Sequence, residues 1–397
     1  MNTELLKSKL LEAAFNGSLT HADISTWEFP KIGDIAFTTS GGTPQAKNKE
    51  YYESGNIRWI RSGELGVKYI YDSEIKITQK ALENSSAKYY PVDSVLIALY
   101  GATVGKVAIL KAESTSNQAV CAIFPNERFT PEYMYYFLSS QRDNFLGIAS
   151  GGAQSNISQE KVKNSIIPLP SIAEQQRIVA ALEEGFTYID AVASAKQNLS
   201  NTAELLRNKI LQAAFDGSLT GADTSTWEDV KLRKVTTKIV DGDHNPPKGE
   251  EDPTPYIMLS SQNINDDTYV AMNKVRYLSK ENFDMCNKRT HLTKGDVLLT
   301  SVGTIGRSCV HNSDEVYCFQ RSVTIITPTI NSYFLKYYFD SPAFQQMLNM
   351  SSTGNAQKGF YLNKLKEVLI PLPSPEEQQR IVAKIDELFT QIDKISN

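Results

Sequence analysis

Long apolar runs, paired cysteines and clustered histidines are all missing from this 397-residue chain. No stretch of about 18 apolar residues occurs, and the opening MNTELLKSKLLEAAF lacks the apolar core and cleavage site of a secretory signal. The four cysteines (Cys121, Cys286, Cys309 and Cys318) form no C-x-x-C pair, and the four histidines are scattered. We therefore expect a cytoplasmic protein with reduced thiols, no membrane span and no metal site.

The net charge of −4 conceals an uneven distribution along the chain. Residues 30–165 and residues 229–368 each carry a net charge of +2, whereas the remaining segments together carry −8. A charge of +2 alone is weak evidence for nucleic-acid binding, because many other domains carry it. The acidic segments are repelled by phosphate, so we expect them to dock proteins rather than face DNA.

Two segments of the chain occur twice. Residues 5–28 and 205–228, which share AAF-x-GSLT, are identical at 17 of 24 positions. Residues 166–190 and 369–393, which share IPLPS and EQQRIV, are identical at 17 of 25 positions. Between these repeats the two halves share only short similar motifs, such as GATVGK opposite GTIGR and GGAQ opposite GNAQ. The pattern indicates one scaffold that presents two different surfaces.

The repeated segments have the signatures of capped helices. Ser171 with Glu174, and Ser374 with Glu377, have the S-x-x-E spacing of a capping box, and Pro375 falls at a first helical position. Apolar residues step by three and four along these helices, as in a coiled-coil seam. The residues predicted to pack between helices or against a partner are Leu6, Leu10, Ile178, Leu182, Ile189, Val192, Leu206, Ile210, Ile381, Ile385, Leu388 and Ile392.

The order of the repeats predicts the architecture. In mid-chain the PLPS helix precedes the AAF segment, whereas at the chain ends the same pair is split, with AAF first and PLPS last. This cyclic order predicts an α+β protein in which two mixed α/β domains are separated by long antiparallel helices with pseudo-twofold symmetry. The central connector is either one continuous helix or a helix broken at Ser200-Asn201-Thr202. The predicted divisions are residues 1–28 (short helix and exit loop), 29–170 (first domain), 171–228 (central spacer), 229–373 (second domain) and 374–397 (C-terminal helix pairing with the spacer).

Two variable domains, each followed by a PLP-x3-EQQRIV helix, resemble the specificity subunit of bacterial type I restriction–modification enzymes over essentially the whole chain. The resemblance implies that each domain is a target recognition domain reading one half of a bipartite, asymmetric sequence in double-stranded DNA. It implies that the helices dock two DNA methyltransferase subunits, that restriction subunits then join, and that the chain itself has no catalytic activity. S-adenosylmethionine, ATP and Mg²⁺ would then be bound by the partners, in a bacterial or archaeal cytoplasm.

Base reading needs Arg, Lys, Asn or Gln side chains on a defined surface, with hydroxyl groups on phosphate. The candidates are Thr43, Lys47, Arg58, Arg61 and Lys106 in the first domain, and His244, Lys248, Gln262, Arg307, Gln320 and Lys358 in the second. The alternative for each is a solvated surface residue. Gln154 and Gln357 are assigned to the fold or to the junction between domain and helix.

Other functions are weighed against this one. GATVGK is one residue short of a phosphate loop, HNPPK lacks the stacking aromatic of an adenine methyltransferase, and the E-x-K in DSEIKI has no paired carboxylate. A self-contained methyltransferase or nuclease would bind its own cofactor. A coiled-coil scaffold with two protein-binding heads would ignore duplex DNA at low salt.

Overall fold

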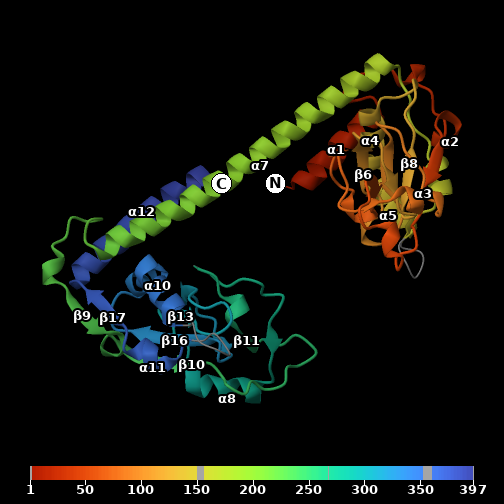
Figure 1. Cartoon of the computed structure of the whole chain (residues 1–397). Coiled ribbons are helices and arrows are strands. Elements are labelled where there is room, and N and C mark those ends of the chain that lie inside the picture. The colour runs from red at the N-terminus through yellow and green to blue at the C-terminus, as the bar shows by residue number, and fades with distance from the viewer. Residues whose placement is uncertain (1, 150–155, 267, 352–359, 397) are drawn as a thin grey trace. The chain divides into compact units, whose positions relative to one another are not determined.

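A computed structural model of the chain describes residues 2–149, 156–266, 268–351 and 360–396. The chain divides into two compact units, Met1–Ala195 (unit 1) and Lys196–Asn397 (unit 2). In each unit an α/β domain lies beside a helix pair (Figure 1). The pair in unit 1 is α1 (Thr3–Phe15) with the first part of α7 (Ile172–Phe215), and in unit 2 it is the rest of α7 with α12 (Pro375–Ser396). The predicted combination of tandem α/β domains and long helices is confirmed.

The central connector is one uninterrupted helix. α7 has 44 residues and therefore extends about 66 Å at 1.5 Å per residue. The Ser200-Asn201-Thr202 stretch does not break it, and two of its three polar side chains form hydrogen bonds along the helix surface. The Thr202 hydroxyl donates to the Asn198 carbonyl at 2.8 Å, and Gln197 donates to the Asn201 carboxamide at 2.9 Å. Of the two predicted alternatives, the continuous helix is confirmed.

Unit 1 contains a mixed sheet in the order β1-β8-β5-β6-β3 and a smaller sheet in the order β4-β2-β7. The strands are β1 (Thr38–Ser40), β2 (Ile57–Ile60), β3 (Tyr69–Ile70), β4 (Lys76–Ile77), β5 (Val95–Ala98), β6 (Val107–Leu110), β7 (Thr115–Ser116) and β8 (Val120–Ile123). The helices are α2 (Ile32–Ile35), α3 (Gln79–Glu83), α4 (Pro131–Ser140), α5 (Arg142–Ala149) and α6 (Gln159–Lys163). Strands β5 and β6 form a hairpin, and its GATVGK segment is a tight turn with Gly101 and Gly105 at positive φ.

Unit 2 repeats this plan with different lengths. Its sheets have the orders β10-β16-β13-β14, β12-β11-β15 and β17-β9. The strands are β9 (Glu228–Lys231), β10 (Thr236–Asp241), β11 (Ile257–Leu259), β12 (Arg276–Tyr277), β13 (Val297–Thr300), β14 (Ser308–Val310), β15 (Cys318–Phe319), β16 (Val323–Pro328) and β17 (Leu369–Leu372). The helices are α8 (Lys280–Thr290), α9 (Ser332–Asp340), α10 (Pro342–Ser351) and α11 (Leu362–Lys366). The helices α4 and α9 are rich in aromatic residues and belong to the main core cluster of their own unit.

Each helix pair is antiparallel. In unit 1, Lys7 forms an ion pair with Asp190 at 2.7 Å, while Thr20 donates to Glu174 at the other end. Unit 2 makes the same two contacts from Arg207 to Asp393 and from Thr220 to Glu377. The glutamates of the predicted capping boxes therefore bind the exit loops, while Ser171 and Ser374 cap the helix starts.

The predicted seam is buried at some positions and exposed at others. Ile178, Leu182, Ile381, Ile385 and Ile392 are buried, and Leu10, Ile189, Ile210 and Leu388 are half-buried. Leu6, Val192 and Leu206 are exposed at 38%, 54% and 44%. These three do not pack between helices within the described chain. For them, contact with a partner protein stays a prediction.

In each unit one buried glutamine fastens the α/β domain to its connector. The Gln175 side chain is fully buried; its oxygen accepts from the Thr130 amide at 2.9 Å, and its nitrogen donates to the Pro170 carbonyl at 3.0 Å. Gln378 makes the matching contacts with the Asn331 amide and the Pro373 carbonyl, both at 3.0 Å. Each carboxamide thus joins the start of an aromatic helix to the PLP lead-in.

The substitution Gln175→Ala should lower the free energy of unfolding by about 1–3 kcal/mol, because it leaves the buried Thr130 amide without its acceptor. The neighbouring Gln176→Ala is the matched control, since Gln176 is exposed and should change stability by less than about 0.5 kcal/mol. Urea denaturation followed by circular dichroism measures both. Equal losses in the two variants would contradict the anchoring role.

Candidate nucleic-acid interface

Four loops of unit 1 meet at one end of its sheets and form what we call loop cluster 1. They follow β1, β2, β5 and β7, and comprise residues 41–48, 61–66, 99–106 and 117–119. The Gly42 amide donates to the Ser116 carbonyl at 2.9 Å, the Asn117 amide to the Ile60 carbonyl at 3.0 Å, and the Leu99 amide to the Ala119 carbonyl at 2.8 Å. Backbone hydrogen bonds therefore hold the loops against one another.

Loop cluster 2 is the equivalent region of unit 2, and comprises residues 242–248, 260–263, 301–307 and 320–322. The Asp243 amide donates to the Phe319 carbonyl at 2.7 Å, the Gln320 amide to the Leu259 carbonyl at 2.9 Å, and the Ser301 amide to the Ser322 carbonyl at 2.9 Å. These are the bonds of cluster 1, made at matching positions. The two units thus share one backbone frame.

The frame brings together several of the predicted DNA-contacting residues. Thr43 and His244 occupy the same place in the first loops. Lys106 and Arg307 occupy the same place at the end of the third loops. Thr43 and His244 are exposed, whereas Lys106 and Arg307 are half-buried. Exposed Gln262 and half-buried Gln320 lie in the second and fourth loops of cluster 2.

The remaining candidates have other surroundings. Arg58 lies on β2 and pairs with Asp72 at 3.1 Å, and Arg61 pairs with Glu64 and Glu74. Both arginines are therefore already neutralised by acidic neighbours. Lys47 and Lys248 are exposed in the first loops. Lys358, Gln154 and Gln357 lie outside the described residues.

Two residues of the fourth loops escaped the sequence analysis. Gln118 and Arg321 are each the middle residue of a three-residue loop, and both are exposed. The Thr43 hydroxyl donates to the Gln118 carboxamide oxygen. The available signal was the alignment of SNQAV with FQRSV, in which these positions coincide and differ.

A small cavity of about 60 Å³ lies within unit 2, lined by Asp241, His244, Arg321, Ser301, Val302, Phe360 and Tyr361. Burial raises the pKa of Asp241 above its usual value, although the Thr324 hydroxyl, which donates to its carboxylate at 2.7 Å, acts in the opposite direction. His244 lies 3.9 Å from the same carboxylate. The cavity therefore has polar side chains on one part of a lining that also includes Val302, Phe360 and Tyr361.

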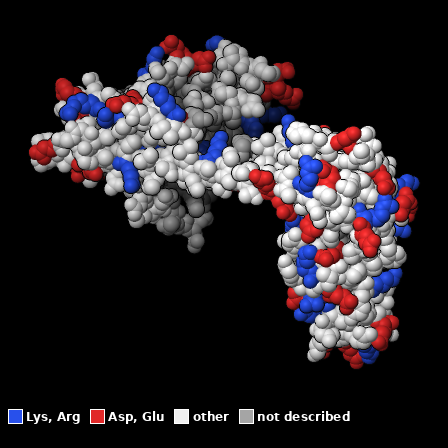
Figure 2. Space-filling view, turned by 90° about the horizontal axis from the view of Figure 1, so that it is seen from above, with Lys and Arg blue, Asp and Glu red and all other residues white. Residues whose placement is uncertain are grey.

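Charges of both signs are mixed on the surface of the molecule that Figure 2 shows. Figure 2 shows acidic and basic side chains interspersed over the face in view, without a broad basic field. Contacts with phosphate would therefore depend on individual cations and backbone amides rather than on an extended positive surface. No group of three or more His, Cys, Asp or Glu side chains that could hold a metal ion is found in the described part of the chain. No described helix is long and apolar enough to cross a membrane.

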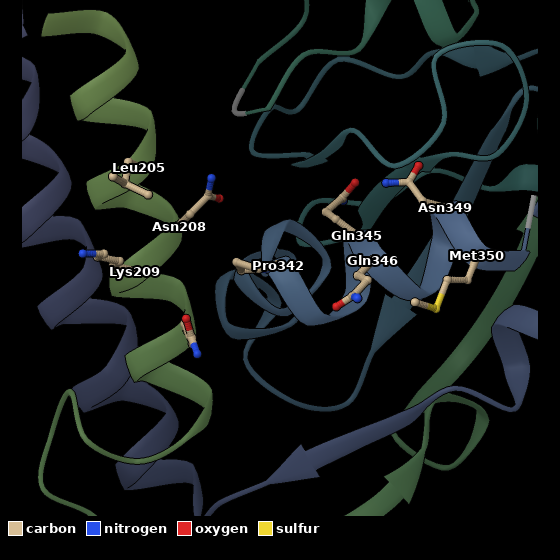
Figure 3. A pocket seen from close by; sticks show the side chains of 9 residues that line it. Leu205, Asn208, Lys209, Pro342, Gln345, Gln346, Asn349 and Met350 are labelled. Atoms are coloured by element: carbon tan, nitrogen blue, oxygen red, sulfur yellow. The ribbon is translucent and has the colours of Figure 1, made fainter. Parts of the chain in front are cut away.

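Each unit also has a groove beside its AAF helix. In unit 1 the groove measures about 920 Å³ and runs between α1 and the start of α5. In unit 2 it measures about 910 Å³ and runs between α7 and α10, where Asn208 lies across from Pro342 and Gln345 (Figure 3). Two grooves of similar volume thus lie at matching positions, with different lining residues.

Two α/β units with one backbone frame and unlike loops, each closed by a PLP helix, define a tandem recognition protein. The chain belongs to the family described as type I restriction modification DNA specificity domain, which matches residues 24–200 and again residues 224–397. The resemblance inferred from the repeated motifs is thereby confirmed.

Among its curated relatives, the chain is similar to the type I restriction enzyme EcoBI specificity subunit of Escherichia coli, with 28% identity over 70% of this chain and 63% of that protein. It is 33% identical to the EcoR124I/EcoR124II specificity subunit of the same organism over 42% of either chain. The chain thus matches less than two thirds of the length of these two relatives.

Solved structures show the same fold. A chain from work on complex assembly and conformational transition of the type I R-M system has a TM-score of 0.69 and 21% identity, and the match covers 94% of this chain and 92% of that one. The HsdS subunit from Thermoanaerobacter tengcongensis has a TM-score of 0.57 and 20% identity, over 93% and 90% of the chains.

Gly41→Ala should disrupt loop cluster 1, since the added Cβ would lie 2.1 Å from the Ser116 carbonyl oxygen and 2.5 Å from that of Asn117. We expect a loss of about 1–3 kcal/mol of stability, measured by thermal unfolding. Gly63→Ala in the same cluster is the control, because its Cβ would meet no atom within 4 Å. A melting temperature unchanged in both variants would show that the frame tolerates the side chain.

A buried ion pair supports the hairpin that carries Arg307. The Ser308 hydroxyl donates to Asp340 at 2.7 Å, and Lys336 pairs with the same carboxylate at 2.9 Å. Burial raises the pKa of Asp340 to about 6, and Lys336 opposes that rise. Tyr136 of α4 donates to Glu183 of α7, and Tyr337 of α9 donates to Asp386 of α12, so these two tyrosines are equivalent. Tyr135 and Ser139 of unit 1 therefore correspond to Lys336 and Asp340 of unit 2.

The free energy of unfolding of unit 2 should therefore fall as the pH rises from about 4 to about 6. In this range folded Asp340 keeps its proton, whereas the unfolded carboxyl has lost it. The double variant Lys336→Tyr/Asp340→Ser copies unit 1 and removes this titration. The difference in unfolding free energy between pH 4 and pH 6.5 should be smaller in the variant, by at most about 3 kcal/mol. Identical pH profiles would contradict the assignment.

Proposed function

We propose that the chain is a non-catalytic specificity subunit that reads a bipartite, asymmetric DNA target, with one half-site for each loop cluster. The observation that carries this proposal is the repetition of one backbone frame with unlike side chains at its loops. Identical clusters on a repeated frame would favour a palindrome, whereas unlike clusters suit two different half-sites. In this proposal residues 29–170 and 229–373 are the recognition domains, and residues 1–28, 171–228 and 374–397 are the connectors.

The proposed partners are two DNA methyltransferase subunits and, after them, restriction subunits. The paired grooves support two equivalent docking places for the methyltransferase. Exposed apolar side chains along the connector helices provide further contact area, and they are Leu5, Leu6, Tyr188, Val192, Leu199, Leu205 and Leu206. S-adenosylmethionine, ATP and Mg²⁺ belong to those partners, and this chain would bind none of them.

Co-expression with the methyltransferase subunits tests the proposal. Sequencing of modified bases in the host DNA should reveal one split, asymmetric target, and cells that lack this chain should reveal none. Random or absent modification by an assembled complex would overturn the proposal. Binding of S-adenosylmethionine by the isolated chain would favour a self-contained methyltransferase instead.

The length of α7 should set the gap between the half-sites. Inserting a second TAEL after residues 202–205 adds four residues to a continuous helix and lengthens it by about 6 Å. The gap should widen by one or two base pairs while both half-sites stay the same. Thr202→Ala, which keeps the length, should leave the gap unchanged. Modified-base sequencing reads out both variants, and an unaltered gap in the longer chain would exclude the spacer role.

A further inference from the structure

Gln118 and Arg321 stand at one position of the shared frame. Each follows a residue whose carbonyl closes a turn, with the Val120 amide donating to Asn117 at 3.2 Å and the Val323 amide donating to Gln320 at 3.0 Å. The residue before each of them is bonded across to the end of the neighbouring strand, β2 in unit 1 and β11 in unit 2. Their Cα positions are therefore held by the same bonds, and their side chains are what differs.

The Arg321 side chain differs from most arginines of the chain. Arg58, Arg61 and Arg207 are paired with carboxylates, as are Arg128, Arg177, Arg233 and Arg380. For the Arg321 guanidinium, no hydrogen bond or ion pair is found with any residue that the structure describes. It lines the small cavity together with His244 and Asp241. Its donors are thus open to a ligand, and its backbone is fixed.

Gln118 is held differently. Its carboxamide oxygen accepts from the Thr43 hydroxyl, which restricts the side chain and leaves its two N–H donors and one oxygen lone pair for a ligand. Because Thr43 corresponds to His244, each side chain also has its own neighbour at the same place in the frame. Accurate recognition of a ligand is favoured by the fixed backbone at both positions, and at Gln118 also by the restrained side chain.

A guanidinium fits the O6 and N7 acceptors of guanine, and a carboxamide fits the N6 donor and N7 acceptor of adenine. We propose that this shared position determines base specificity, with Arg321 reading a guanine in the half-site of unit 2 and Gln118 an adenine in the half-site of unit 1. The inference rests on the proposed function, and it adds the positions and the bases.

The experiment uses the full chain assembled with its methyltransferase subunits, and modified-base sequencing of host DNA. Wild type first defines the target. Arg321→Gln should then relax the requirement for guanine at one position of one half-site, with discrimination falling roughly 10- to 100-fold. Gln118→Ala should relax one adenine position in the other half-site. Lys294→Gln, which removes an exposed charge outside the cluster, should leave the target unchanged.

Other outcomes separate the failures. A wild-type complex without a split target would overturn the proposed function itself. A split target that survives Arg321→Gln unchanged would overturn only this inference. A uniform loss over all single-base variants of the target would assign Arg321 to a phosphate and would also overturn it. Copurification with the methyltransferase verifies that each variant folds. If Arg321→Gln does not assemble, Arg321→Lys repeats the test, because lysine keeps the charge but lacks the paired donors.

Discussion

The buried carboxamides of Gln175 and Gln378 are the constraint on which the rest of the protein depends. Each joins three pieces of chain that are distant in sequence: the start of an aromatic helix, a PLP lead-in and a connector helix. A buried amide that lost any of these partners would be left unsatisfied, so the junction admits few other arrangements. The orientation of each α/β domain on its helix pair follows from this junction, and the same junction is built twice.

The shared frame separates two requirements that a recognition protein has to meet. Backbone-to-backbone bonds hold the loops and depend little on side-chain identity. The exposed side chains between those bonds can therefore differ widely, as Thr43 and His244 do, without disturbing the fold. The connector helices would need the opposite property if, as proposed, each half docks the same kind of partner, because identical partners require identical surfaces. This explains why the connectors are nearly repeated while the domains retain only short common marks.

The two units have different residues at equivalent positions beneath their sheets. Helix α9 holds a Lys336–Asp340 ion pair where α4 has Tyr135 and Ser139. The ion pair is tied to Ser308 and so to the hairpin that presents Arg307. A buried pair of this kind contributes little net stability, but breaking it is costly. It therefore limits which residues unit 2 can accept beneath its loops.

The sequence by itself determined the family, the tandem organisation, the hairpins and the helix ends, because these follow from repeats, glycine turns and apolar periodicity that act over a few residues. It predicted Ser171 and Ser374 as helix caps, and each hydroxyl accepts a hydrogen bond from the amide of the predicted glutamate. It did not separate buried from exposed seam positions such as Ile178 and Val192, since periodicity is the same on both and burial needs a neighbour. It proposed Arg58 and Arg61 but passed over Arg321, because charge alone does not reveal a partner. Only the tertiary structure decided which cations are already paired and which loops meet, since those contacts join residues far apart in the chain.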